Sequence, residues 1–177
     1  PGVDVTVFAT PALLQAHPWL DGFDVVVAPG AVGPSRPVRV AAESTWLLLA
    51  ARRAGIDVLH HPGGTIPPVR ATPAVVTIHD LQPLHNPERF SPLKRAYLRT
   101  RLRPSVRGAR LTTAVSGFTR DDIVDRLGVD PDRVAVTPPA VDSDPPEPED
   151  VTDDEVRRAL RLDRPWFVYP AITYGHK

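Results

Sequence analysis

Short runs of β-branched and aromatic residues recur along the 177-residue chain, and they limit its fold more than any other feature. Most of these runs are continuously apolar and do not alternate with polar residues. Strands covered on both faces have this pattern, which favours a parallel sheet over a half-exposed antiparallel one. The predicted strands are Val3–Phe8, Phe23–Ala28, Asp57–His61, Ala74–His79, Leu111–Val115, Arg133–Thr137 and Trp166–Tyr169.

Helical patterns separate several of these strands. Residues 43–54 gather apolar side chains on one face and stop at Gly55, and residues 92–103 follow a Ser-Pro start. Ser116 is a suitable N-cap for a further helix that Gly128 would end. The resulting β-α-β-α-β order predicts an α/β fold with a Rossmann-like, doubly wound and mostly parallel sheet.

The composition changes after Thr137, where "PPAVDSDPPEPEDVTDDE" is rich in proline and acidic residues. Such a segment lacks the apolar residues for a core and reads as an extended linker. We therefore expect a main domain over residues 1–141, itself truncated at its start. Residues 142–164 would form the linker and a short helix, and residues 165–177 the first strand of a second domain.

Global composition excludes several functional classes. The formal net charge is zero, so nothing indicates a nucleic-acid partner, and the absence of cysteine excludes disulfides and thiolate chemistry. No apolar run is long enough to span a bilayer and no signal segment opens the chain, which leads us to expect a cytoplasmic protein.

An ionisable pair, His79 and Asp80, follows a predicted core strand with no turn residue between them. In open parallel sheets, ligands bind beyond the carboxyl ends of the strands. An imidazole there can donate a hydrogen bond or polarise a reacting oxygen, and a neighbouring carboxylate can fix its tautomer. The alternative is a buried structural histidine, with Asp80 capping the next turn; from the pattern alone the two interpretations are evenly balanced.

A second strand end carries two further histidines. His60 and His61 close the strand that begins at Asp57, and the loop "PGGTIPP" follows, in which Gly63 and Gly64 would let a backbone approach a ligand. Adjacent strand residues point to opposite faces, so the pair is poorly placed to share one metal ion. With no His-x-x-x-His helix and no cysteine pair in the chain, we expect no metal site.

Seven basic residues and no acidic ones lie between Lys94 and Arg110. A helical charge run of this kind is most often a solvated face. The second interpretation is peripheral contact with anionic lipid headgroups at the inner membrane surface, or with a phosphorylated substrate.

Four segments together resemble glycosyltransferase family 4, the retaining GT-B enzymes, and in particular its bacterial mannosyltransferase-like members. They are "DVLHHPGGTIPP", "AVVTIHDLQPLHNPERFSPLKRAYLR", "TTAVSGFTRDDIVDRLGVDPDRVAVTPPAVD" and "WFVYPAITYGHK". The resemblance implies two Rossmann-like domains that face each other across a cleft. This chain would be the amino-terminal acceptor domain, the linker and the first strand of the nucleotide-sugar domain.

The resemblance also implies roles for individual residues. His79 and Asp80 would be catalytic, the first stabilising charge near the reacting sugar and the second orienting the loop or the imidazole. His60, His61, Gly63 and Gly64 would form an acceptor-binding wall. Ser116 and Thr119 match the start of a helix, as a structural cap or a site. Lys177 would bind the donor diphosphate.

The implied activity is glycan biosynthesis: transfer of a hexose, such as mannose, from a nucleotide diphosphate sugar to a saccharide or lipid-linked acceptor with retention. The nucleotide sugar is a co-substrate, and no cofactor or metal is implied. Two alternatives stay open. One is a GT-B nucleotide-sugar epimerase, and the other is a non-catalytic domain that binds sugar or protein.

Overall fold

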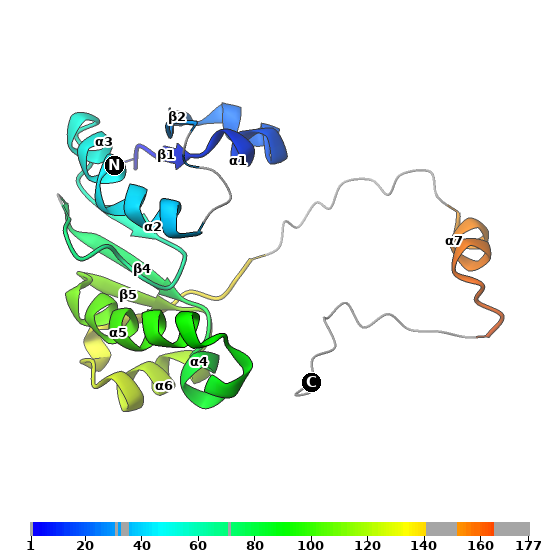
Figure 1. Cartoon of the computed structure of the whole chain (residues 1–177). Coiled ribbons are helices and arrows are strands. Elements are labelled where there is room, and N and C mark those ends of the chain that lie inside the picture. Colours follow the sequence, from blue (N-terminus) through cyan, green and yellow to red (C-terminus); the bar gives the residue numbers. More distant parts are fainter. Residues whose placement is uncertain (1, 31, 33–35, 71, 141–151, 165–177) are drawn as a thin grey trace. The chain divides into compact units, whose positions relative to one another are not determined.

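The computed structural model describes residues 2–30, 32, 36–70, 72–140 and 152–164 (Figure 1). The chain divides into two compact units, residues Pro1–Pro139 and Ala140–Lys177. The strand predicted at Trp166–Tyr169, most of the predicted linker and Lys177 lie outside the described residues.

Among the described residues of the first unit, six short strands form two sheets, and every pair of neighbouring strands is parallel. One sheet pairs β1 with β2, and the other has the order β3-β4-β5-β6. The fold is therefore the predicted Rossmann-like α/β class. The strands are β1 Thr6–Ala9, β2 Asp24–Val27, β3 Leu59–His61, β4 Ala74–Ile78, β5 Leu111–Ala114 and β6 Val134–Val136.

A loop, residues 62–73, joins β3 to β4 with no helix among its described residues. Helices connect the other consecutive strands, as is usual for parallel pairing. Among the described residues they are α1 Pro11–Ala16, α2 Arg36–Ser44, α3 Trp46–Arg53, α4 Gln82–His85, α5 Pro92–Gly108, α6 Gly117–Leu127 and α7 Asp153–Leu160. Short 3₁₀ turns cover Pro18–Gly22, Pro87–Arg89 and Pro131–Arg133.

Two helices differ from the sequence-based expectation. The helix expected over residues 43–54 is two helices, α2 and α3, which meet at Thr45, a residue with non-helical backbone angles. The helix expected to stop at Arg103 continues to Gly108 through Pro104. Tertiary packing explains the extension, because Ser105 and Val106 beyond the proline are buried in the core.

One face of the four-stranded sheet carries the core. On β4, Ala74, Val76 and Ile78 are buried, whereas Val75 and Thr77 between them are only half-buried. The buried face packs with apolar residues of α5 and α6, which Figure 1 shows beside β4 and β5. The sequence predicts strands covered on both faces, but in the described part of the chain β4 alternates and leaves its second face partly open.

The second unit's described segment is α7, preceded by its N-cap. The Thr152 side chain accepts a hydrogen bond from the Glu155 backbone N–H, and the Glu155 carboxylate accepts one from the Thr152 backbone N–H. This reciprocal capping box satisfies two N–H groups that a helix start otherwise leaves without partners.

Gly128 caps the carboxyl end of α6, and we expect even its replacement by alanine to destabilise the fold. It ends the helix in a left-handed conformation with φ of 63°, and an added Cβ would lie 3.3 Å from Nη2 of Arg107. We expect Gly128→Ala to lower the free energy of unfolding by about 1 kcal/mol in urea titrations. Gly117→Ala, at the open start of the same helix, is the control, and an equal loss in both variants would contradict this account.

Candidate functional site

Polar side chains line the open face of the sheet across three adjacent strands. Nε2 of His60 on β3 lies 2.7 Å from Oγ1 of Thr77 on β4, and this oxygen lies 2.7 Å from Oγ1 of Thr113 on β5. The parallel register places Thr77 directly opposite Thr113. The three side chains form a continuous hydrogen-bonded row, which we call the polar row.

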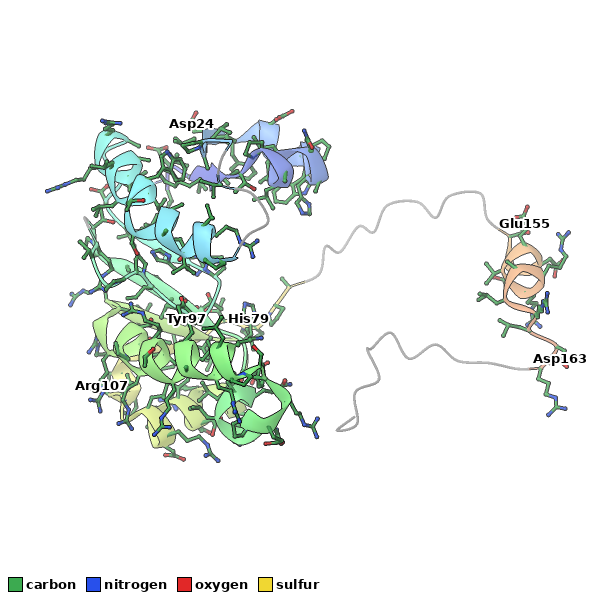
Figure 2. All side chains as sticks on the ribbon, viewed as in Figure 1. Asp24, His79, Tyr97, Arg107, Glu155 and Asp163 are labelled. Atoms are coloured by element: carbon green, nitrogen blue, oxygen red, sulfur yellow. The ribbon has the colours of Figure 1, made fainter. Side chains whose placement is uncertain are left out.

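His79 stands at the carboxyl end of β4, two residues after Thr77, and is exposed (Figure 2). Its Nε2 lies 3.0 Å from the carbonyl oxygen of Pro62, the first residue of the loop that follows β3. Because a carbonyl only accepts, Nε2 carries the proton of this bond. In the neutral imidazole the lone pair is then on Nδ1, so the contact fixes the tautomer.

The loop after β3 is fastened to α5. The backbone N–H of Ile66 donates to Oγ of Ser105 over 3.0 Å, and the carbonyl of Ile66 accepts from Nη2 of Arg101 over 2.7 Å. Oγ1 of Thr65 lies 3.2 Å from the Tyr97 hydroxyl. Gly64 adopts the left-handed φ of 82° that this turn requires. The loop that holds His79 is thus itself held by buried or half-buried groups.

Asp80 contacts the turn that follows it. Its Oδ1 accepts a hydrogen bond of 3.0 Å from the backbone N–H of Gln82, at the start of α4. This Asx-type contact matches the structural alternative considered for Asp80. The carboxylate orients the loop after His79.

Ser116 and Thr119 lie at the start of α6, close to the end of β4. Oγ of Ser116 accepts from the Thr119 backbone N–H over 3.1 Å, which makes Ser116 the N-cap. Oγ1 of Thr119 donates to the carbonyl of His79 over 3.4 Å. The cap therefore also holds the backbone of the histidine.

A polar cluster around the Asp122 carboxylate, which sequence reasoning missed, joins α4 to α6. Nε2 of His85 lies 2.5 Å from Oδ2 of Asp122, and Nε of Arg126 lies 2.6 Å from Oδ1 of the same carboxylate. The Asp122–Arg126 spacing of four residues is a visible helical signal. The 37-residue separation of His85 from Asp122 leaves no such signal, because only the fold brings them together.

The two histidines of β3 have opposite environments, as strand alternation predicts. His60 is exposed and belongs to the polar row, whereas His61 is 6% exposed, and its Nε2 has no hydrogen-bond partner among the described residues. Burial lowers the pKa of His61 from 6.5 to about 4, and the positive charges of His60 and Arg70 contribute to the shift. Of this pair, only His60 is presented to a ligand at the surface.

The basic segment from Lys94 to Arg110 divides into separate environments. The Lys94 ammonium lies 4.5 Å from the centre of the Phe90 ring, and Arg101 is engaged with the loop after β3. Four other arginines repeat at every fourth residue and are exposed, and we call them the arginine ridge: Arg95, Arg99, Arg103 and Arg107.

Neither a metal cluster nor a membrane-spanning helix is found in the part of the chain that the structure describes. Within it, no three His, Asp or Glu side chains are grouped so that they could hold a metal ion. No described helix combines the length and apolarity needed to cross a bilayer. Lys177, expected to bind the donor diphosphate, lies outside the described residues.

The buried His61 predicts a pH dependence of stability. In the unfolded chain it takes up a proton below about pH 6.5, but in the folded chain only below about pH 4. The unfolded state therefore binds more protons between these values, and stability falls as pH falls through this window by up to about 3 kcal/mol. Above pH 6.5, His61 is neutral in both states and does not make stability depend on pH.

Chemical denaturation at intervals from pH 7 to pH 4 measures this loss. We expect His61→Leu to flatten the slope, whereas His17→Leu, a change at an exposed histidine, should leave it as in the parent chain. An unchanged slope in His61→Leu would assign the acid sensitivity to other groups.

Comparison with known proteins was made at three levels. The family model described as Glycosyltransferase Family 4 matches residues 1–145. No curated protein matches the chain. Among solved structures, a glycosyltransferase from Rickettsia africae ESF-5 is similar at 12% sequence identity and a TM-score of 0.47, with 89% of this chain and 40% of that chain covered. Because the family model spans most of the sequence, the chain belongs to glycosyltransferase family 4.

Proposed function

We propose that this chain is the acceptor-domain portion of a retaining hexosyltransferase. The enzyme would move a hexose, with mannose as the first candidate, from a nucleotide diphosphate sugar to a saccharide or lipid-linked acceptor. Family membership supports the transferase class. The observation that carries the proposal is the exposed imidazole of His79, held in one tautomer by Pro62 at the carboxyl end of a parallel strand.

His79 would act on the reacting sugar through its free ring nitrogen. Since Nε2–H is engaged by Pro62, Nδ1 of the neutral ring can accept a hydrogen bond from a sugar hydroxyl. A fixed dipole in this position stabilises the positive charge that develops on an oxocarbenium-like anomeric centre, and it needs no reorganisation at the moment of reaction. Pro62, which holds the ring, and Thr119, which holds the backbone carbonyl of His79, would contribute by keeping the imidazole in place.

The polar row is well suited to the acceptor. Hydroxyl and imidazole groups that are already bonded to one another offer directed donors and acceptors, and sugars are bound through such groups. His60 is the exposed end of the row. With Gly63 and Gly64 in the neighbouring loop, it would form the acceptor wall, while the buried His61 would support the wall from behind.

The arginine ridge provides a second interaction for a lipid-linked acceptor. Like charges four residues apart on a helix repel one another by roughly 0.2–0.5 kcal/mol per pair. The four ridge arginines therefore do not stabilise α5 through their charges. Each arginine near an anionic bilayer contributes about 1 kcal/mol of attraction. We include in the proposal a peripheral contact of α5 with an anionic membrane surface.

Replacing His79 tests the catalytic role. In the full-length protein, assayed with nucleotide sugars and acceptor, we expect His79→Ala to lower kcat by about 100-fold, the typical effect of losing one preorganised electrostatic contact. His17→Ala, at an exposed histidine outside the site, is the control. Transfer and donor hydrolysis within a few-fold of the parent would exclude the role. The anomeric configuration of the product, and whether acceptor is required, separate transfer from epimerisation.

Replacing threonines on the two faces of β5 tests the acceptor role. Thr113 belongs to the polar row, whereas Thr112 is buried on the core face and its hydroxyl has no partner among the described residues. We expect Thr113→Val to raise KM for the acceptor about tenfold with little change in donor hydrolysis, because one hydrogen bond is worth about 1 kcal/mol or more. Thr112→Val should leave KM unchanged. Equal effects would mean that the row has only a structural role.

A further inference from the structure

A cleft of about 690 Å³ lies at the end of the sheet opposite to His79. It is lined by the residues that begin or precede three strands: Ala74 starts β4, Arg110 precedes β5 and Arg133 precedes β6. His79 follows the other end of β4, roughly 16 Å away for a five-residue strand. Figure 2 shows Arg107, which immediately precedes the cleft residue Gly108, at the left edge of the first unit and His79 nearer its middle.

Among the described residues, three arginines and no acidic residue line the cleft. Nη1 of Arg70 donates to the carbonyl of Pro67 over 3.2 Å, and Nη2 donates to that of Gly108 over 3.1 Å. Nη2 of Arg133 donates to the carbonyls of Arg107 and Ala109. These bonds fix the two guanidinium planes but use only some of the five N–H donors that each group carries.

The approach of Arg70 depends on a glycine. A Cβ added at Gly108 would lie 3.2 Å from Nη2 and 3.4 Å from Nη1 of Arg70, closer than most real contacts of this kind. The absent side chain thus makes room for the guanidinium against the end of α5.

Arg110 differs from the other two arginines. Its backbone N–H donates to the carbonyl of Ala74, which places the residue at the start of β5. Its side chain is exposed and makes no hydrogen bond or ion pair with the described residues. The carboxylate of Asp130, three residues before Arg133, accepts from the Asp132 backbone and is absent from the cleft lining. The cleft therefore combines two anchored cations with a third whose donors are unused.

We propose that this cleft binds a phosphate group of an organic ester. Three guanidinium groups, with no carboxylate among the described lining residues, create a positive potential. A carboxylate ligand carries only one negative charge, whereas a phosphate monoester carries a charge of −1.5 to −2. The planar fork of arginine matches phosphate oxygens in pairs. The volume exceeds that of a phosphate alone, and Pro68 and the 58% exposed Val69 offer apolar surface for the organic part.

Arg110→Gln tests the proposal, because the side chain supports no contact within the described fold. Arg52→Gln is the matched control: it also removes one exposed arginine charge but lies on α3, outside both the cleft lining and the arginine ridge. Arg110→Lys keeps the charge and removes the fork. Binding of the whole chain is measured by calorimetry with inorganic pyrophosphate, and by co-sedimentation with phosphatidylcholine vesicles with and without phosphatidic acid.

We expect Arg110→Gln to weaken binding about tenfold, Arg110→Lys to restore part of it, and Arg52→Gln to stay within twofold of the parent. If Arg110→Gln weakens pyrophosphate binding in this way, the ligand is a soluble phosphate compound. The same loss confined to phosphatidic acid vesicles identifies a lipid headgroup. The proposal is overturned if neither probe binds, if Arg110→Gln and Arg52→Gln lose affinity equally, or if only Arg52→Gln loses affinity, since binding would then follow overall charge or another surface.

Discussion

The parallel pairing of β4 with β3 on one side and β5 on the other decides where the candidate groups lie. Pairing fixes the register, and register fixes which side chains share a face. On β4 it sends Val76 and Ile78 into the core with α5 and α6, and it brings Thr77 beside His60 and Thr113. A slip of one residue would exchange these faces, burying the hydroxyls and exposing the aliphatic side chains. The core and the polar row are therefore two results of one constraint.

The second constraint is the fastening of the loop after β3. The Pro62 carbonyl in this loop accepts the hydrogen bond that orients the His79 ring. That bond can orient the ring only if the loop backbone is itself restrained. Contacts from Arg101 and Ser105 to Ile66 supply that restraint from α5. This also explains why α5 continues past Pro104, since ending the helix there would remove Ser105 from its place against the loop.

Much of the fold could be predicted from the sequence, because the signals for strands and caps are local. The β-branched runs located each described strand to within three residues, and Ser116 and Gly128 marked the ends of α6. Local signals do not reveal pairing. Thr77 and Thr113 gave no sign of a shared row, and His85 and Asp122 gave none of contact, because their closeness depends on register and helix packing. Adjacent His60 and His61 could be predicted to point apart, but not which of the two is buried.

The same parallel arrangement separates two kinds of chemistry at the ends of the strands. Toward the carboxyl ends, imidazole and hydroxyl groups are bonded to one another in a row suited to sugar hydroxyls. At the amino ends, Arg70, Arg110 and Arg133 keep their charge at any physiological pH. Arg70 lies close enough to His61 to lower its pKa, yet Arg70 and Arg133 donate their hydrogen bonds to backbone carbonyls and not to the polar row or to His79. The two ends of the sheet can therefore bind different ligands without sharing a side chain.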